Sequence, residues 1–197
     1  GPEVQWINNA WYIYYSASNK DDLGTQRIHV LKGRKIPTAI EASIKLTTNI
    51  GGTNIFDKYT YAGQLFNEWS IDGTVLRFPD KNYFVYSCQR TGLQSLCIAP
   101  MNSATSVGAA KTLSQPTLPW EKIGEFPVNE GPAALYHGGK TFLTYSASYC
   151  WTSSYQLGLL TYKSGDPTNA ASWTKSGPVF SSANGNYGTG HNGYVVC

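Results

Sequence analysis

The sequence predicts an all-β fold in the form of a β-propeller, and two observations support that prediction. Only 14% of the 197 residues are charged, whereas 14% are aromatic and 20 are Gly. This composition is typical of strands joined by tight turns, because aromatic residues favour strands and Gly favours turns. The second observation is an internal repeat of about sixty residues, which indicates an architecture of stacked units.

The repeated unit has a fixed order of parts. A polar or acidic residue opens a short apolar run, a turn follows, and an aromatic strand then ends in Tyr-Ser. The three copies cover residues 2–18, 71–87 and 129–148, and a fourth begins at 190–192. Another apolar run follows each copy, at 28–31, 96–99 and 157–161. Each unit therefore holds at least three antiparallel strands, and a fourth fits before the next unit begins.

The repeat also predicts how the sheets are arranged. A sheet of three or four strands cannot bury both of its faces, so the units must stack on one another. Radial stacking of four-stranded sheets is a β-propeller, in which the first strand of each unit runs along a central axis. A β-sandwich is the alternative, and the regularity of the repeat disfavours it. We expect residues 1–197 to be a single propeller domain, present in part.

Charge and hydropathy exclude two classes of partner. The net charge is only +3, and the densest basic cluster, at residues 32–35, is explained more simply as a solvated turn than as a nucleic-acid site. No apolar stretch approaches the roughly 18 residues that a membrane-spanning helix needs. We therefore expect neither a nucleic-acid nor a membrane partner.

The four cysteines leave the redox state open. They are Cys88, Cys97, Cys150 and Cys197, and their spacing is not that of a metal site. Cys88 and Cys97 fall on neighbouring strands of one predicted hairpin, where either a disulfide or two buried thiols fits the pattern.

Four polar residues stand at what we predict to be one repeat position: Glu3, Asp72, Glu130 and His191. The first strands of successive propeller units face one another around the axis. The repeat therefore predicts that three acids and a histidine converge there as a functional site. The alternative is that each is satisfied separately at its own strand end.

These residues lie in motifs that resemble a known family. Pro-Glu-Val at 2–4, Trp-Ser-Ile-Asp-Gly-Thr at 69–74, Val-Asn-Glu-Gly-Pro at 128–132 and Gly-Thr-Gly-His-Asn at 188–192 occur in the order found in glycoside hydrolase family 43. The resemblance covers the chain from end to end. The stretches 142–148, 155–161 and 172–175 resemble the arabinofuranosidase and exo-arabinanase branch of that family.

The resemblance implies a five-bladed propeller with an inverting mechanism and three essential acids. Glu130 corresponds to the general acid, and Asp72 to the residue that orients the acid and tunes its pKa. His191 corresponds to a histidine on the axis beneath the sugar, where it is expected to contact the substrate and often holds a calcium ion through water; a buried histidine bonded within the axis is the alternative. The general base corresponds to an Asp of the first blade, and no Asp precedes Glu3. We therefore expect about three blades and the start of another, without the first blade or the end of the last.

The chemistry explains these residue types. Inverting hydrolysis needs one protonated carboxyl for the leaving oxygen and one carboxylate to activate water. A charged Asp72 beside Glu130 would raise the pKa of Glu130 by like-charge repulsion. Glu3 is expected to line the site and bind sugar hydroxyls, or else to be structural. Trp69 and Trp120 are candidate platforms for the apolar face of a sugar, although a strand tryptophan more often packs in a core.

The resemblance implies a secreted, monomeric glycosidase that releases L-arabinofuranose from arabinan or arabinose-substituted plant cell-wall polysaccharide. No cofactor is required for this reaction, and a structural calcium on the axis is optional. Two alternatives remain: a β-xylosidase on the same scaffold, and a non-catalytic sugar-binding propeller. Because the general base is not found, we expect the 197-residue chain alone to have negligible turnover.

Overall fold

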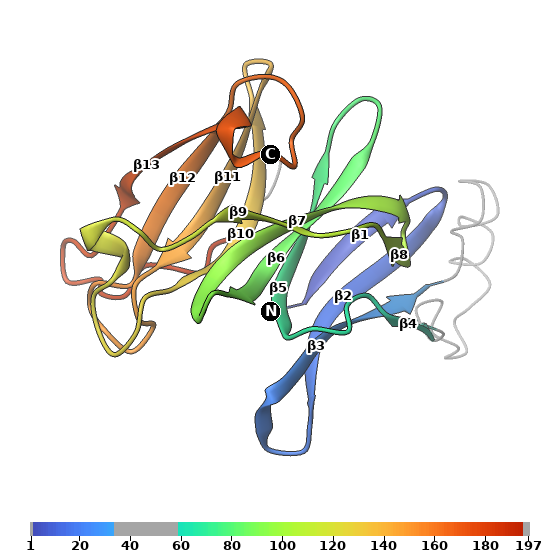
Figure 1. Cartoon of the computed structure of the whole chain (residues 1–197), viewed down its shortest axis with the longest axis horizontal. Coiled ribbons are helices and arrows are strands. Elements are labelled where there is room, and N and C mark those ends of the chain that lie inside the picture. The colour runs from blue at the N-terminus through green and yellow to red at the C-terminus, as the bar shows by residue number, and fades with distance from the viewer. Residues whose placement is uncertain (1, 34–58, 195–197) are drawn as a thin grey trace, which may run out of the picture.

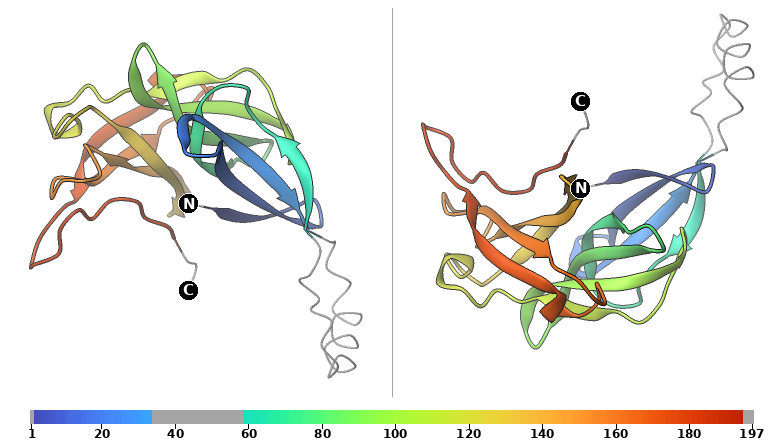
Figure 2. Two further views of the ribbon diagram at one scale, coloured as in Figure 1. Left: turned by 90° about the horizontal axis from the view of Figure 1, so that it is seen from below. Right: turned by 90° about the horizontal axis from the view of Figure 1, so that it is seen from above.

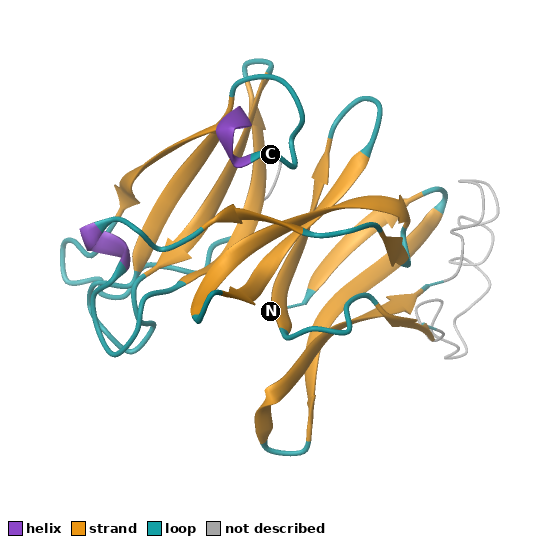
Figure 3. Ribbon diagram, viewed as in Figure 1, coloured by secondary structure: helices purple, strands orange, loops and turns teal. Residues whose placement is uncertain are grey.

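The computed structural model describes residues 2–33 and 59–194, and these residues form three antiparallel sheets (Figures 1 and 3). The first sheet consists of β1 (Glu3–Ile7), β2 (Ala10–Asn19), β3 (Asp22–Lys32) and β4 (Thr60–Gln64). The second consists of β5 (Ser70–Arg77), β6 (Asn82–Arg90), β7 (Leu93–Ser103), β8 (Ser106–Val107) and β9 (Lys111–Ser114). The third consists of β10 (Asn129–His137), β11 (Lys140–Ala147), β12 (Gln156–Tyr162) and β13 (Trp173–Phe180). Two short 3-10 helices, η1 (Pro119–Glu121) and η2 (Ala170–Ser172), lie in connections.

Each sheet corresponds to one copy of the repeat, as predicted. Neighbouring strands within each sheet pair antiparallel, and tight turns join β1 to β2, β6 to β7 and β10 to β11. The second sheet differs by its two-residue β8 and by β9, which pairs with β7. The β1–β2 turn holds Asn8 and Asn9 at φ 47° and 62°, and the β10–β11 turn holds Gly138 and Gly139 at φ 56° and 71°. Asn and Gly adopt this left-handed conformation readily, and consecutive positive φ angles suit two-residue hairpins.

The core lies between successive sheets (Figure 2). Tyr14 of β2 packs against Phe84 of β6, with ring centroids 4.9 Å apart, in the cluster that joins the first and second sheets. Leu96 of β7 and Leu143 of β11 are fully buried in the cluster that joins the second and third sheets. The stacking that the repeat predicted is therefore present. The first strands are neighbours as well, since β5 contacts both β1 and β10.

The expected start of a fourth unit is not found as a strand. Among the described residues after β13, only an isolated bridge between Ala183 and Asn186 pairs, and residues 190–192 carry no strand. Residues 195–197 lie outside the described part of the chain. Within the described part of the chain, no helix is long and apolar enough to cross a membrane.

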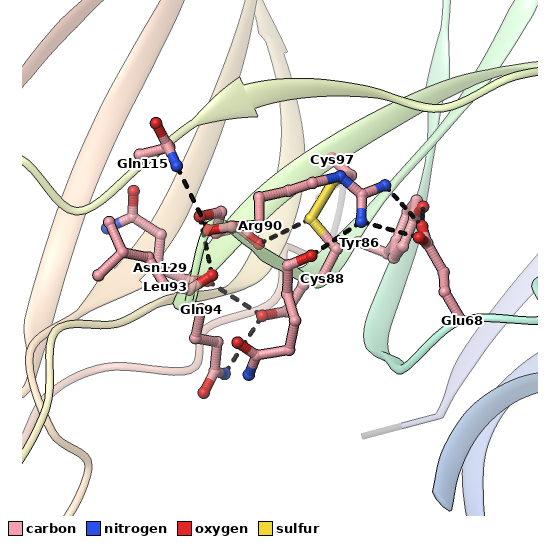
Figure 4. The surroundings of a disulfide bond; sticks show 12 residues. Glu68, Tyr86, Cys88, Arg90, Leu93, Gln94, Cys97, Gln115 and Asn129 are labelled. Atoms are coloured by element: carbon pink, nitrogen blue, oxygen red, sulfur yellow. Dashed lines mark hydrogen bonds and ion pairs between the residues drawn. A yellow bond between two sulfur atoms is a disulfide. The ribbon is translucent and has the colours of Figure 1, made fainter. Parts of the chain in front are cut away.

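The second sheet contains a disulfide between Cys88 of β6 and Cys97 of β7, whose Cα atoms are 5.9 Å apart (Figure 4). The two residues are diagonal neighbours, because Cys88 pairs with Ser95 and Cys97 pairs with Tyr86. Both cysteines are fully buried. This settles the choice that the sequence left open for this pair. Cys150 is free and exposed, and Cys197 lies outside the described residues.

Removing this disulfide should destabilise the protein. Replacing Cys88 and Cys97 together by Ala is expected to lower the free energy of unfolding by about 2.5 kcal/mol, the chain-entropy cost of a loop of this length. Urea unfolding followed by tryptophan fluorescence measures the change. Cys150→Ala is the control and should leave the unfolding midpoint unaltered. Equal effects of the two changes would contradict a structural role for the disulfide.

Candidate active site

A pocket of about 830 Å³ lies where β1, β5, β10 and residues 191–194 meet. Its wall includes Glu3, Asp72 and His191. Gly131, the residue after Glu130, also lines it. Three separate copies of the repeat therefore contribute to one cavity, as the arrangement around an axis predicted.

The prediction that the polar residues occupy one equivalent repeat position is wrong, because the strand registers place them differently in each sheet. In the third sheet Glu130 pairs with Ser146 of the Tyr-Ser signature, and in the second sheet Ile71 pairs with the equivalent Ser87. Asp72 therefore stands one position beyond the equivalent of Glu130. A register shift follows directly in both strands, between Ile71 and Thr74 in β5 and just after Glu130 in β10. Such bulges re-aim side chains locally, so sequence spacing alone does not fix which residues are equivalent.

Glu3 lies further from the position equivalent to Glu130 than Asp72 does. It pairs with Tyr14, two residues before the serine of the first Tyr-Ser signature. Its Oε1 accepts hydrogen bonds from the Thr74 hydroxyl at 2.9 Å, the Val75 N–H at 3.0 Å and the Gln5 side chain at 2.6 Å. Burial raises the pKa of Glu3, and these three hydrogen bonds oppose that rise. Glu3 therefore joins β1 to β5 beside the pocket, and its binding of sugar hydroxyls stays a prediction.

Asp72 is held in an uncommon backbone conformation. Its φ is 52°, which Asp adopts more readily than most residues do. Its N–H donates to Ser16 Oγ at 3.3 Å. The next residue must be Gly, because a Cβ on Gly73 would overlap the Phe84 ring. The Ile-Asp-Gly motif thus turns the Asp72 carboxylate, which is 12% exposed, toward His191 Nδ1 at 3.9 Å.

Both carboxylate oxygens of Glu130 are hydrogen-bonded. Tyr155 donates its hydroxyl to Oε1 at 2.7 Å, and Gln94 donates its side-chain amide to Oε2 at 2.7 Å. Tyr155 lies just before β12, and Gln94 belongs to β7 of the preceding sheet. The carboxyl is therefore fixed in orientation by groups from two sheets.

The surroundings raise the pKa of Glu130 above that of an ordinary glutamate. Burial is the largest cause, because it disfavours the charged form. The negative charge of Asp72 raises the pKa further, while the hydrogen bonds from Tyr155 and Gln94 and the nearby His191 ring lower it. The expected effect of Asp72 is therefore present but is smaller than that of burial. A carboxyl that keeps its proton toward neutral pH suits a general acid.

His191 is not the buried histidine that the sequence left as an alternative. Its side chain is 46% exposed, its N–H donates to Ser146 Oγ at 2.6 Å, and its φ is 54°. Among residues 2–33 and 59–194, no group of three or more His, Cys, Asp or Glu side chains forms a metal-binding set. These side chains do not form a direct metal site, so the binding of calcium through water stays a prediction.

The contacts of the two candidate sugar platforms, Trp120 and Trp69, are made outside the lining of this pocket. Trp120 packs on Tyr145 in the core of the third sheet, with ring centroids 6.2 Å apart. The indole N–H of Trp69 donates to the Leu23 carbonyl at 3.0 Å. Neither side chain is among the residues that line the pocket. Trp120 therefore packs in the core, which was the alternative to a sugar platform. Trp69 directly precedes β5, the strand that contains Asp72, and its role as a platform stays a prediction.

Sequence reasoning missed the residues that support the acids. The serines of the three Tyr-Ser signatures each reach the next unit: Ser16 accepts from the Asp72 N–H, Ser87 donates to the Asn129 carbonyl, and Ser146 accepts from the His191 N–H. Their recurrence was a usable signal. Gln94 and Tyr155 carry no such signal, because each contacts Glu130 only through the packing of strands that are distant in the chain.

Known proteins share this arrangement of sheets and motifs. The sequence profile of glycosyl hydrolases family 43 matches residues 1–197. The chain belongs to this family. Its members therefore provide the comparison for the pocket.

Several proteins similar to this chain are named arabinofuranosidases. The chain is 38% identical to an extracellular exo-alpha-(1->5)-L-arabinofuranosidase of Streptomyces avermitilis and 35% identical to alpha-L-arabinofuranosidase 43 of Humicola insolens. Each match covers 99% of this chain but 39% of the relative. The crystal structure of an alpha-L-arabinofuranosidase from Lactobacillus brevis superposes with a TM-score of 0.81 at 30% identity, covering 99% of this chain and 60% of that one. The chain thus spans less than two thirds of the length of each of these relatives.

The family-43 site predicts a pH effect for Asp72→Asn. Asn tolerates the φ of 52°, so the change removes the charge and keeps the backbone. A general acid works while protonated, so with Glu130 in that predicted role the rate of the full-length protein should fall as pH rises through the pKa of Glu130. Removing the Asp72 charge lowers that pKa, and the alkaline limb of the pH–rate profile should move to lower pH. Asp21→Asn, in an exposed turn, is the control; an unmoved alkaline limb in Asp72→Asn would contradict the tuning role.

Tyr155→Phe should act in the opposite direction. The Tyr155 hydroxyl donates to Glu130 and lowers its pKa, so its loss should raise that pKa and move the alkaline limb to higher pH. The pH dependence of kcat/KM, measured beside wild type, tests this. Tyr162→Phe is a matched control, because that hydroxyl donates to the Gly165 carbonyl at 2.6 Å, remote from Glu130. A downward shift in Tyr155→Phe would overturn the expectation.

Proposed function

We propose that these residues are part of a five-bladed propeller that releases L-arabinofuranose from arabinan or from arabinose-substituted cell-wall polysaccharide. The observation that carries the proposal is Glu130: a carboxyl of raised pKa, bonded on both oxygens and near the charge of Asp72. The three described sheets correspond to three blades. The names of the relatives support the choice of sugar and an extracellular location.

In this proposal Glu130 donates its proton to the oxygen that leaves with the rest of the polysaccharide. A water molecule on the opposite face of the sugar attacks the anomeric carbon, which inverts its configuration. Burial and the charge of Asp72 together favour the protonated acid before the reaction, and Asp72 orients it. Tyr155 and Gln94 hold the carboxyl in place. We assign no described residue to the general base, so the activity is proposed for the full-length protein.

Two chromogenic substrates test the sugar. The full-length protein should release p-nitrophenol from p-nitrophenyl α-L-arabinofuranoside and should hydrolyse the corresponding β-D-xylopyranoside far more slowly. Dominant hydrolysis of the xyloside would replace the arabinofuranosidase proposal by a β-xylosidase. The 197-residue chain alone should show negligible turnover of either substrate, and measurable release by it would mean that one of its own residues serves as base.

A further inference from the structure

A buried charged network lies behind Glu130 and outside the pocket. At its centre is Glu121 of η1, which is 0% exposed. Its Oε2 accepts the N–H groups of Thr117 and Leu118, both at 2.8 Å. Its Oε1 accepts from the Tyr145 hydroxyl at 2.9 Å and pairs with Lys175 Nζ at 2.5 Å. A charge is retained in a protein interior only when it is paired and hydrogen-bonded in this way.

The network fixes Asn129, the residue directly before Glu130. Asn129 is fully buried, and its side-chain amide donates to Glu121 Oε1 at 3.0 Å. Its side-chain oxygen accepts from the Ser114 hydroxyl at 2.9 Å and from Lys175 Nζ at 3.5 Å. Both ends of the amide are therefore held, by groups that come from η1, β9 and β13. The position of the Asn129 backbone, from which the Glu130 side chain starts, is fixed with it.

A relay of directional hydrogen bonds continues from Asn129 to the Glu130 carboxylate. The Ser87 hydroxyl donates its only proton to the Asn129 carbonyl at 3.0 Å. Its oxygen can then only accept, and it accepts from Gln94 Nε2 at 3.2 Å. The same Nε2 donates to Glu130 Oε2 at 2.7 Å.

This relay determines which end of the Gln94 amide faces the acid. Because Ser87 requires a donor, the amide presents N–H rather than C=O to Glu130. Gln94 lies close to the start of β10, since it forms an isolated bridge with Val128, the residue before that strand.

We propose that the Glu121–Lys175–Asn129 network and the Ser87–Gln94 relay together position the proton-donating carboxyl of Glu130. These are positioning residues, and apart from Gln94 they do not touch the acid. The inference rests on the proposed function, because it assigns a role in acid catalysis.

Two leaving groups separate this role from general structural damage. Nitrophenolate leaves readily without a proton, whereas the sugar oxygen of α-1,5-arabinobiose needs one. The ratio of kcat/KM for p-nitrophenyl arabinofuranoside to kcat/KM for arabinobiose therefore reports acid catalysis. Loss of active protein lowers both constants equally and leaves the ratio unchanged.

Ser87→Ala in the full-length protein is the first variant. We expect kcat/KM for arabinobiose to fall about tenfold, a part of the 10²- to 10⁴-fold that a general acid supplies, with p-nitrophenyl arabinofuranoside affected less than about twofold. Ser95→Ala is the matched control: it is the same change at a fully buried position of the same sheet, where the hydroxyl donates to the Leu93 carbonyl. It should leave the ratio at the wild-type value.

Asn129→Ala is the second variant, and the Ser87→Ala/Asn129→Ala double variant completes a cycle. If both residues act through one relay, the double variant should change the ratio no more than the larger single change does, because coupled residues are not additive. If the ratio stays at the wild-type value in Ser87→Ala and in Asn129→Ala, the positioning role is overturned. If wild type hydrolyses neither substrate, the proposed function itself fails; the two failures are thus distinguishable.

Discussion

Glu130→Gln should abolish most hydrolysis of arabinobiose and spare much of the hydrolysis of p-nitrophenyl arabinofuranoside. The amide keeps the shape of the carboxyl and cannot donate an acidic proton to the leaving oxygen. We expect kcat/KM for arabinobiose to fall by about 10³-fold, within the range of general acid catalysis, and that for the nitrophenyl substrate by less than about tenfold. Steady-state kinetics of the full-length protein on both substrates measures the difference.

The control for this prediction lies five residues upstream. Glu125 is an exposed carboxylate of the loop that leads into β10, and Glu125→Gln should leave both rates within about twofold, as expected for a surface change. The loss of kcat/KM should be selective for arabinobiose, the substrate with the poor leaving group. An equal loss on both substrates would show that Glu130 is not the proton donor.

Lys175→Met should cause the largest loss of stability. Methionine keeps much of the length of the side chain and removes the charge, which leaves the Glu121 carboxylate without its cation. The side chain of Lys175 is only 20% exposed and that of Glu121 is 0% exposed. Breaking a buried pair by removing one partner costs about 3–5 kcal/mol. The free energy of unfolding in urea, followed by tryptophan fluorescence, gives the value.

A second lysine provides the comparison. Lys111 pairs with Asp166 at 3.5 Å, and both side chains are more than half exposed. Lys111→Met should therefore cost less than about 1 kcal/mol, as is usual for surface pairs. Equal losses in the two variants would contradict the view that the Glu121 network is a buried structural charge.

The repeat predicted much of the fold because each unit has the same order of strands and turns. A turn between two strands that bury aromatic residues produces a similar hairpin in each sheet, where Tyr14, Tyr86 and Tyr145 are fully buried. The three sheets and the meeting of their first strands follow from that periodicity. The disulfide stayed open because two buried thiols on one hairpin produce the same sequence pattern.

The candidate site was predictable only where a motif marks a backbone feature. Asp72 and Glu130 stand in such motifs and lie beside register shifts. The bulges themselves leave no periodic signal, so sequence spacing did not reveal that Asp72 stands one position beyond the equivalent of Glu130. Gln94 is separated from Glu130 by 36 residues and contacts it only because two sheets pack together. Contacts of this kind depend on tertiary packing, which one sequence does not reveal.

The most direct test of the central claim is a time course of the full-length protein with linear α-1,5-arabinan. Free arabinose, measured by chromatography, should accumulate with the wild-type protein and should be reduced about 10³-fold in Glu130→Gln, because the sugar leaving group needs the acid. A protein that binds arabinan without shortening it, or a Glu130→Gln variant that releases arabinose at the wild-type rate, would contradict the account.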